Sequence, residues 1–323
     1  MRTIALSCAG GAAGITALEL LRQDQDLRLV AFDADPNSFA QVIADDFHLV
    51  ASPLTEPSYG EALLGALVNC NAEVLLPCHS GELAHLASLD SVLSRHGIKW
   101  PKPFPGPLDI LLDKLSLYGA LGRAGIPVPS YSIADAVRAF PSERVVFKRR
   151  TGGGSRGLSF AGPGEPVPTS VTSEPTTYVE QVAIDGLEVS LDGVVLTNGN
   201  VLGPIGRVRV AVRNGLAIVS ESIDLGTEGR DLYERVARVV GACGAMNMQA
   251  FISDGHLVGV TDVNPRFPAG GMALSAQLGL NLPSIVVQDL LFGPGHVQTN
   301  LISFRRLRHY RKWSDVFVAV DEP

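Results

Sequence analysis

The stretch that ends at Arg266 contains oxygen-bearing side chains at a spacing that suits a metal ion. Asp254-Gly255 is a favoured two-residue turn between two strand-like runs, so a β-hairpin is expected here. Side chains two apart on a strand share a face, which puts Asp262 and Asn264 on one side of the ribbon, together with Gln249 from the other strand. Three oxygen donors, of which one is charged, suit a hard divalent cation that also takes ligands from phosphate and water.

The turn also predicts the register of this hairpin. Residues whose numbers sum to 509 would lie opposite one another, so Gln249 would face Val260. Arg266 follows directly and is placed to meet negative charge that develops on a transferring phosphoryl group. A half-exposed hairpin with polar residues on its solvent face would show the same alternation, and that interpretation stays open here.

Two arginines, Arg207 and Arg209, stand two apart in a strand-like run. Guanidinium groups side by side repel one another unless an anion lies between them, and a carboxylate or phosphate fits their fork geometry. We therefore expect this pair to hold an anionic group. An exposed strand with solvated arginines is the alternative.

A glycine turn, Ala9–Gly14, follows the first apolar run, and Asp33 lies at the end of the second. The pattern is close to the dinucleotide-binding fingerprint, with Ala9 in place of the first glycine. A tight strand-to-helix turn needs glycine for backbone reasons alone and explains the same residues.

Further polar residues follow the third apolar run, in the segment from Cys78 to Glu82. Ligands of open α/β sheets bind at the carboxyl ends of strands, so His79 and Glu82 are candidates to line a pocket for a second substrate. A solvated loop histidine is the alternative.

The elements that must position these residues fall into two regions. In residues 1–105, short apolar runs alternate with amphipathic stretches, which is typical of a parallel sheet covered by helices. The expected strands are Thr3–Cys8, Leu27–Phe32 and Glu73–Pro77, and the expected helices are Gly14–Arg22 and Tyr59–Val68. A proline-rich linker at 100–107 precedes an α+β region, 106–323. Its expected elements are helices at Leu108–Gly125, Asp231–Cys243 and Asn281–Phe292 and the hairpin at Met246–Asn264.

The bulk composition excludes several classes of protein. The chain has 323 residues and a formal net charge of −7, with no basic stripe interleaved with aromatic residues, so nucleic acid is not expected as a partner. No run of eighteen apolar residues occurs, so a membrane span is not expected either. The four widely spaced cysteines are typical of reduced core residues in a cytoplasmic protein.

Taken together, the motifs resemble those of the ATP-grasp superfamily. Asn247-Met-Gln249 with Asp262-Val-Asn-Pro-Arg266 is similar to the metal hairpin of its carbamoyl-phosphate-synthetase-like branch of carboxylate–amine ligases. Asp262 stands where that family usually has glutamate. The resemblance implies an α/β N-terminal parallel-sheet lobe followed by an α+β ATP-grasp fold. That fold would comprise a mobile lid at about 127–180 and a C-terminal antiparallel-sheet lobe.

The resemblance also implies a nucleotide site. Lys114 lies at the start of the expected helix, and Lys148 ends a strand before a glycine-rich loop that contains Gly153, Gly154 and Ser155. A lysine ammonium binds phosphate as a point charge, and a glycine-rich loop lets backbone N–H groups approach it. By the same resemblance, Glu180 and Val182 border the adenine and Glu188 accepts the ribose hydroxyls. Gln249, Asp262 and Asn264 would bind the metal, and Arg266, Arg207 and Arg209 would act in catalysis.

The implied function is an ADP-forming ligase that makes a carbon–nitrogen bond. ATP with Mg²⁺ (or Mn²⁺) would phosphorylate a carboxylate, and an amine or similar nucleophile would capture the acyl phosphate. The partners are small-molecule carboxylate and amine substrates, with a homodimer as one possible assembly. Two alternatives remain at this point, a nicotinamide-dependent oxidoreductase that uses the glycine turn and a non-catalytic nucleotide-binding regulator of the same fold.

Overall fold

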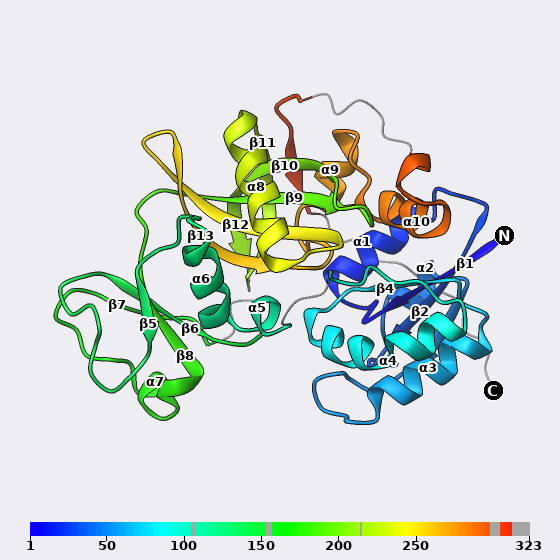
Figure 1. Ribbon diagram of the computed structural model, residues 1–323, viewed down its shortest axis with the longest axis horizontal. Coiled ribbons are helices and arrows are strands. Elements are labelled where there is room, and N and C mark those ends of the chain that lie inside the picture. Colours follow the sequence, from blue (N-terminus) through cyan, green and yellow to red (C-terminus); the bar gives the residue numbers. More distant parts are fainter. Residues whose placement is uncertain (105–107, 153–156, 214, 298–303, 312–323) are drawn as a thin grey trace.

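Three β-sheets, built from consecutive stretches of chain, organise the computed structural model (Figure 1). The structure describes residues 1–104, 108–152, 157–213, 215–297 and 304–311. In the view of Figure 1 the N-terminal sheet lies on the right, a small sheet on the left, and the largest sheet above and between them. The expected fold class, a parallel-sheet lobe followed by antiparallel sheets, is confirmed.

The N-terminal sheet is parallel, with strand order β3-β2-β1-β4. Its strands are β1 (Arg2–Ser7), β2 (Leu27–Asp33), β3 (Asp46–Leu49) and β4 (Val74–Pro77), and its helices are α1 (Ala12–Leu21), α2 (Ala40–Ile43), α3 (Tyr59–Asn69) and α4 (Leu83–Arg95). A 3₁₀ turn, Ser80–Glu82, precedes α4. One face of the sheet packs against α3 and α4, while the other shares a core with α1 and the C-terminal helices. Burial on both faces explains why β1 reads as an apolar run.

The left-hand sheet of Figure 1, which we call the lid sheet, is antiparallel, with strand order β5-β8-β6-β7. It contains β5 (Tyr131–Ile133), β6 (Val145–Arg149), β7 (Ser159–Ala161) and β8 (Tyr178–Val182), with the short helix α7 (Thr169–Thr172) and the 3₁₀ turn Pro175–Thr177. It has a small core of its own around Phe147 and Val171. Two helices, α5 (Asp109–Leu112) and α6 (Lys114–Arg123), lead into it.

The central sheet is antiparallel, with strand order β13-β12-β9-β10-β11-β14. Its strands are β9 (Leu187–Val195), β10 (Val201–Arg213), β11 (Leu216–Ile223), β12 (Gly244–Ser253), β13 (His256–Asn264) and β14 (Arg308–Tyr310). The accompanying helices are α8 (Gly226–Val240), α9 (Met272–Gln277) and α10 (Leu282–Phe292), followed by the 3₁₀ turn Pro294–His296. One face packs on α6 and α8, and α10 joins the other end of the sheet to the N-terminal lobe.

The single helix expected at Leu108–Gly125 was wrong, because the chain forms two helices that break at Asp113. Asp113 has extended backbone angles, and its carboxylate accepts the N–H of Leu115 at 2.8 Å as the N-cap of α6. The same carboxylate pairs with Arg150. Helix α8 also begins at Gly226, earlier than expected, and sequence reasoning did not predict β3 or α4. In the described ranges, no helix has both the length and the apolar character needed to cross a membrane.

Candidate functional site

One face of the central sheet carries a row of polar side chains. Asp262 of β13 lies opposite Gln249 of β12. Gln249 lies opposite Ser190 of β9, which in turn pairs with Arg207 of β10. Because directly opposed residues point to the same side, these four side chains share one face. The alternating neighbours, such as Met248, belong to the core under α6 and α8, so the sheet is apolar beneath and polar above.

The predicted register of the hairpin was wrong near this row. β12 and β13 shift by one residue at two places, and Gln249 lies opposite Asp262 instead of Val260. Each shift puts an extra residue on β13, as a β-bulge does, and bulges re-aim the side chains beside them. The N–H of Val260 bonds to the carbonyl of Pro127 at 2.9 Å, a contact outside the hairpin that the turn does not predict. The correction brings Gln249 and Asp262 directly together and leaves their common face unchanged.

Two lysines from other elements reach the Asp262 end of the row. Lys114, the first residue of α6, has its ammonium 3.6 Å from the Asp262 carboxylate and donates to the carbonyl of Gly152 at 3.1 Å. Lys148, on β6 of the lid sheet, donates to the carbonyl of Thr261 at 3.4 Å. The lid sheet, α6 and the hairpin therefore meet at one spot.

The charges at this spot shift one another's pKa. Burial lowers the pKa of Lys148 to about 8. The positive charge of Lys114 lowers this pKa further, whereas the negative charge of Asp262 raises it. Burial alone would raise the pKa of Asp262, but Lys114, Lys148 and Arg266 hold it below its ordinary value. Asp262 is thus ionised at neutral pH among three cations. A surplus of positive charge in a partly desolvated place attracts a polyphosphate.

Arg266 lies at the far end of the hairpin. Its guanidinium donates to the carbonyl of Phe267 at 2.8 Å and to the amide oxygen of Asn264 at 3.5 Å. The Asn264 amide in turn donates to Asp262 at 3.2 Å. Burial raises the pKa of Cys78, just after β4, while Arg266 acts in the opposite direction. Arg266 is therefore close enough to affect the pKa of both Asp262 on the hairpin and Cys78 at the carboxyl edge of the N-terminal sheet.

The oxygen donors of the hairpin fit one divalent cation. Asp262 supplies an ionised carboxylate, with Gln249 directly across the ladder and Asn264 two residues along. Within the described part of the chain, no cluster of three or more His, Cys, Asp and Glu side chains could hold a metal by itself. A magnesium ion here would take its remaining ligands from phosphate and water, as magnesium ordinarily does.

Arg207 and Arg209, which we expected to hold an anionic group, each pair with a carboxylate of the protein itself. Arg207 is 4% exposed and pairs with Asp192 at 2.7 Å, while Arg209 pairs with Glu188 at 2.7 Å. Both carboxylates come from β9, so the protein itself supplies the anions that keep the two guanidinium groups apart. Neither arginine is a solvated strand residue, so that alternative is wrong.

The cover over Arg207 is unusually close. A Cβ added at Gly271 would come within 1.9 Å of Nε of Arg207 and 2.4 Å of the Asp192 carboxylate. Only glycine lets the backbone before α9 lie on this buried ion pair. Among the described residues, Nη1 of Arg207 has no hydrogen-bond partner.

The residues expected around the nucleotide base lie at the junction of the lid sheet and the central sheet. Glu180 is fully buried, and its carboxylate accepts the N–H groups of Ala139 and Phe140 and pairs with Arg138, so its side chain is held by the protein itself. Val182 ends β8 and donates its N–H to the Ser130 carbonyl. Gly153, Gly154 and Ser155 lie outside the described residues.

The glycine turn after β1 is filled by the protein itself. The N–H of Gly10 donates to the Asp33 carboxylate at 2.6 Å, and a Cβ added at Gly10 would lie 2.4 Å from the hydroxyl of Ser38. A Cβ at Gly14 would meet the Ala9 backbone at 2.4 Å. Close packing therefore explains why glycine stands at positions 10 and 14. Asp33 already accepts a hydrogen bond from Gly10, whereas in a dinucleotide site the corresponding acidic residue would bind the ribose.

Sequence reasoning missed two parts of the site. Tyr118 of α6 is fully buried and donates to Gln181 at 2.9 Å and to the Thr261 carbonyl at 2.7 Å, which ties the lid sheet to the hairpin. Asp192 holds Arg207 and Asn247. The polar residues at every second position of β9 could have indicated that Asp192 belongs to the site. No pattern in the sequence indicates a role for Tyr118.

Comparisons with known proteins agree with this architecture. Residues 176–309 match the family described as ATP-grasp in the biosynthetic pathway with Ter operon. The biotin carboxylase of Campylobacter jejuni, solved with an ATP analogue, superposes with a TM-score of 0.72 at 17% identity, over 93% of this chain and 74% of that one.

Two further solved structures have the same fold. N5-carboxyaminoimidazole synthetase of Staphylococcus aureus with ADP gives a TM-score of 0.69 at 17% identity, over 90% of this chain and 77% of that one. The L-amino acid ligase of Bacillus licheniformis gives a TM-score of 0.68 at 14% identity, over 93% of this chain and 78% of that one. Among curated proteins, none matches the sequence. The chain thus has the fold of these structures, and residues 176–309 match an ATP-grasp family, in agreement with the motifs.

Proposed function

We propose that the chain is an ATP- and magnesium-dependent ligase that activates a carboxylate as an acyl phosphate and couples it to an amine or similar nucleophile. The observation that carries the proposal is the meeting of Lys114, Lys148 and Asp262 where the lid sheet, α6 and the metal hairpin converge. Two cationic side chains beside one ionised carboxylate are the parts that a nucleotide polyphosphate with its cation requires.

Each residue of this spot has a distinct part in the proposed reaction. Lys148 and Lys114 hold the phosphate oxygens, and Asp262, Gln249 and Asn264 hold the cation. Bound magnesium would supply neutralisation of the phosphate charge during transfer. In this scheme the guanidinium of Arg266 stabilises the charge on the phosphoryl group as it passes to the carboxylate.

The arginine pairs of β10 support a revised role for these residues. Arg209 orients Glu188 through their 2.7 Å pair, which suits Glu188 for the ribose hydroxyls. Arg207 is anchored by Asp192 through Nε and keeps Nη1 for another acceptor. We therefore assign the carboxylate substrate to the Arg207 side and treat Arg209 as a positioning residue.

The nicotinamide-dependent alternative has less support. Its motif, the glycine turn, is occupied by Ser38 and Asp33. The chain's likeness to ATP-bound and ADP-bound structures extends over at least nine-tenths of its length.

The test is a pairwise screen of amino acids and other small acids against amines, with ADP and phosphate release as the readout. A ligase releases one ADP and one phosphate per product, and only when acid and nucleophile are both present. ATP binding without ADP release across the screen would favour the non-catalytic regulator. Thermal stabilisation by NADH and not by ATP would instead favour the oxidoreductase.

A further inference from the structure

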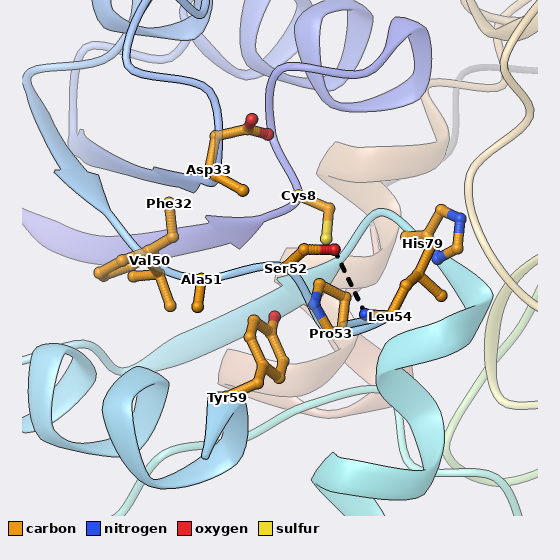
Figure 2. A pocket seen from close by; sticks show the side chains of 11 residues that line it. Cys8, Phe32, Asp33, Val50, Ala51, Ser52, Pro53, Leu54, Tyr59 and His79 are labelled. Atoms are coloured by element: carbon orange, nitrogen blue, oxygen red, sulfur yellow. Dashed lines mark hydrogen bonds between the residues drawn. The ribbon is translucent and has the colours of Figure 1, made fainter. Parts of the chain in front are cut away.

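A cavity of about 220 Å³ lies at the carboxyl edge of the N-terminal sheet (Figure 2). Cys8 follows β1, Asp33 ends β2, and His79 follows β4, and all three line it. Ligands of open α/β sheets bind at this edge. The volume is below the roughly 300–1,000 Å³ of pockets that hold drug-sized ligands, so it suits a small molecule and not a dinucleotide.

Apolar side chains form much of the cavity wall. Phe32, Val50, Pro53 and Leu54 line it, and Tyr59 lies at its side in Figure 2. Leu54 is 59% exposed and therefore stands at the rim. A molecule that fills this space needs an apolar part to pack on these groups.

The cavity lining carries an acidic group. Asp33 lines it, and among the described residues that line it there is no lysine or arginine. The fully buried carboxyl of Glu82 lies behind the wall, where it accepts the phenol of Tyr59 at 2.6 Å and the N–H of His79 at 2.9 Å. Glu82 therefore holds two lining residues, Tyr59 and His79, in place by hydrogen bonds without lining the cavity itself.

The thiol and the phenol of the lining stay neutral. Burial, and after it Glu82, raises the pKa of the Cys8 thiol and of the Tyr59 phenol, so both keep their protons at neutral pH. The ring of His79 accepts the N–H of Gly81 at Nδ1. An anion in this cavity would meet the Asp33 carboxylate and, among the described lining residues, no lysine or arginine, whereas a cation would be attracted.

Cys78 connects the cavity electrostatically with the hairpin. Cys78, the residue before His79, lies within electrostatic reach of both Asp33 at the cavity and Arg266 on the hairpin. Asp33 of the cavity and Arg266 at the end of the polar row therefore both lie near Cys78.

We propose that this cavity binds the nitrogen nucleophile of the ligation, as a small primary amine with an apolar substituent. The proposal rests on the proposed ligase function, which supplies the acyl phosphate. The bound ammonium first loses a proton to water. Its nitrogen then forms the new bond to the acyl carbon, the carbon–oxygen bond to phosphate breaks, and phosphate leaves with the electron pair. The second N–H proton passes to solvent.

The test uses two probes that share one branched carbon chain, isobutylamine and isovalerate. Each is titrated into the ¹⁵N-labelled full chain, with and without ADP and Mg²⁺, and the amide signals of Val50, Ala51, Ser52 and Leu54 are followed. Isobutylamine should shift them saturably, and isovalerate should not. Leu54→Arg adds a positive charge at the rim and should weaken isobutylamine at least about tenfold. The matched control is Leu49→Arg, at a leucine that is 62% exposed and does not line the cavity.

Two results would overturn the assignment. One is equal or tighter binding of isovalerate, and the other is the absence of saturable isobutylamine shifts in both nucleotide states. The ADP-release screen is read separately. Amine binding that Leu54→Arg weakens, without ADP release from any pair, would sink the ligase function and leave the amine site standing. ADP release without amine binding here would do the reverse.

Discussion

The hairpin of β12 and β13 and the glycine turn after β1 both carry motifs that suggest ligand binding, yet their surroundings differ. Around the hairpin, Lys114 and Lys148 arrive from two other elements and face Asp262. Around the glycine turn, Ser38 and Asp33 occupy the space above Gly10. A motif indicates a ligand-binding site when other elements place side chains of opposite charge beside it. The same kind of motif is a packing device when its neighbours fill it.

The largest expected effect comes from Asp262→Asn, which keeps the size of the side chain and removes its charge. ADP production should fall by at least about a hundredfold, because the hairpin loses its one carboxylate for the cation. Part of the activity should return at high magnesium or with manganese.

Thr261→Val is the matched control for Asp262→Asn. Thr261 contributes its backbone carbonyl to Tyr118 and Lys148, and valine retains that carbonyl, so activity should stay within a few fold. An inactive Thr261→Val beside an active Asp262→Asn would show that the hairpin is not the metal site.

Lys148→Met should weaken ATP binding by roughly tenfold to several hundredfold, given about 1.5–3 kcal/mol for a hydrogen bond to a charged group. Because the pKa of Lys148 is about 8, its ammonium is lost above that pH. Wild-type affinity should therefore fall as pH rises through about 8, and this fall should be missing in Lys148→Met. Calorimetry at pH 6.5 to 9.5 measures both. If folded Lys148→Met bound ATP as tightly as the wild type, the ATP phosphates would have to bind away from Lys148.

The glycine turn gives a smaller effect of a different kind. Gly14→Ala should destabilise the fold by about 1–3 kcal/mol, since its Cβ would meet backbone atoms of Ala9. Gly11→Ala should be near neutral, since its Cβ would lie 3.7 Å from the nearest atom. Denaturant unfolding measures the stability of both variants. Loss of ATP turnover in a stable Gly11→Ala variant would make the turn part of the site.

The smallest effect concerns the cation in the absence of nucleotide. Lys114 competes with a cation for the Asp262 carboxylate, so free Mn²⁺ should bind several-fold more tightly to Lys114→Met than to the wild type. ADP should reduce this difference in Mn²⁺ affinity, because in the wild type Lys114 would bind the ADP phosphates instead of Asp262. Titration followed by electron paramagnetic resonance reports bound Mn²⁺. Weaker metal binding in Lys114→Met would contradict the competition.

The sequence predicted the parts of the fold that local patterns determine. Buried parallel strands read as apolar runs, and Asp254-Gly255 located the hairpin. Its register near Asp262 could not be predicted, because a bond from Val260 to Pro127 lies outside the hairpin. The partners of Arg207 and Arg209 were also hidden, since Asp192 and Glu188 become neighbours only when β9 pairs with β10. Local patterns determine elements, while contacts between distant elements decide which charges remain available.

The unbroken pairing of β12 with β9 has a practical consequence. These strands run together from Gly244 to Ile252 without a register shift, so β9 holds Gln249 in place independently of the hairpin tip. The tip at Asp254-Gly255 is exposed and projects from the sheet (Figure 1). A short peptide tag or fluorescent label inserted between Asp254 and Gly255 should therefore report on the protein without altering nucleotide affinity.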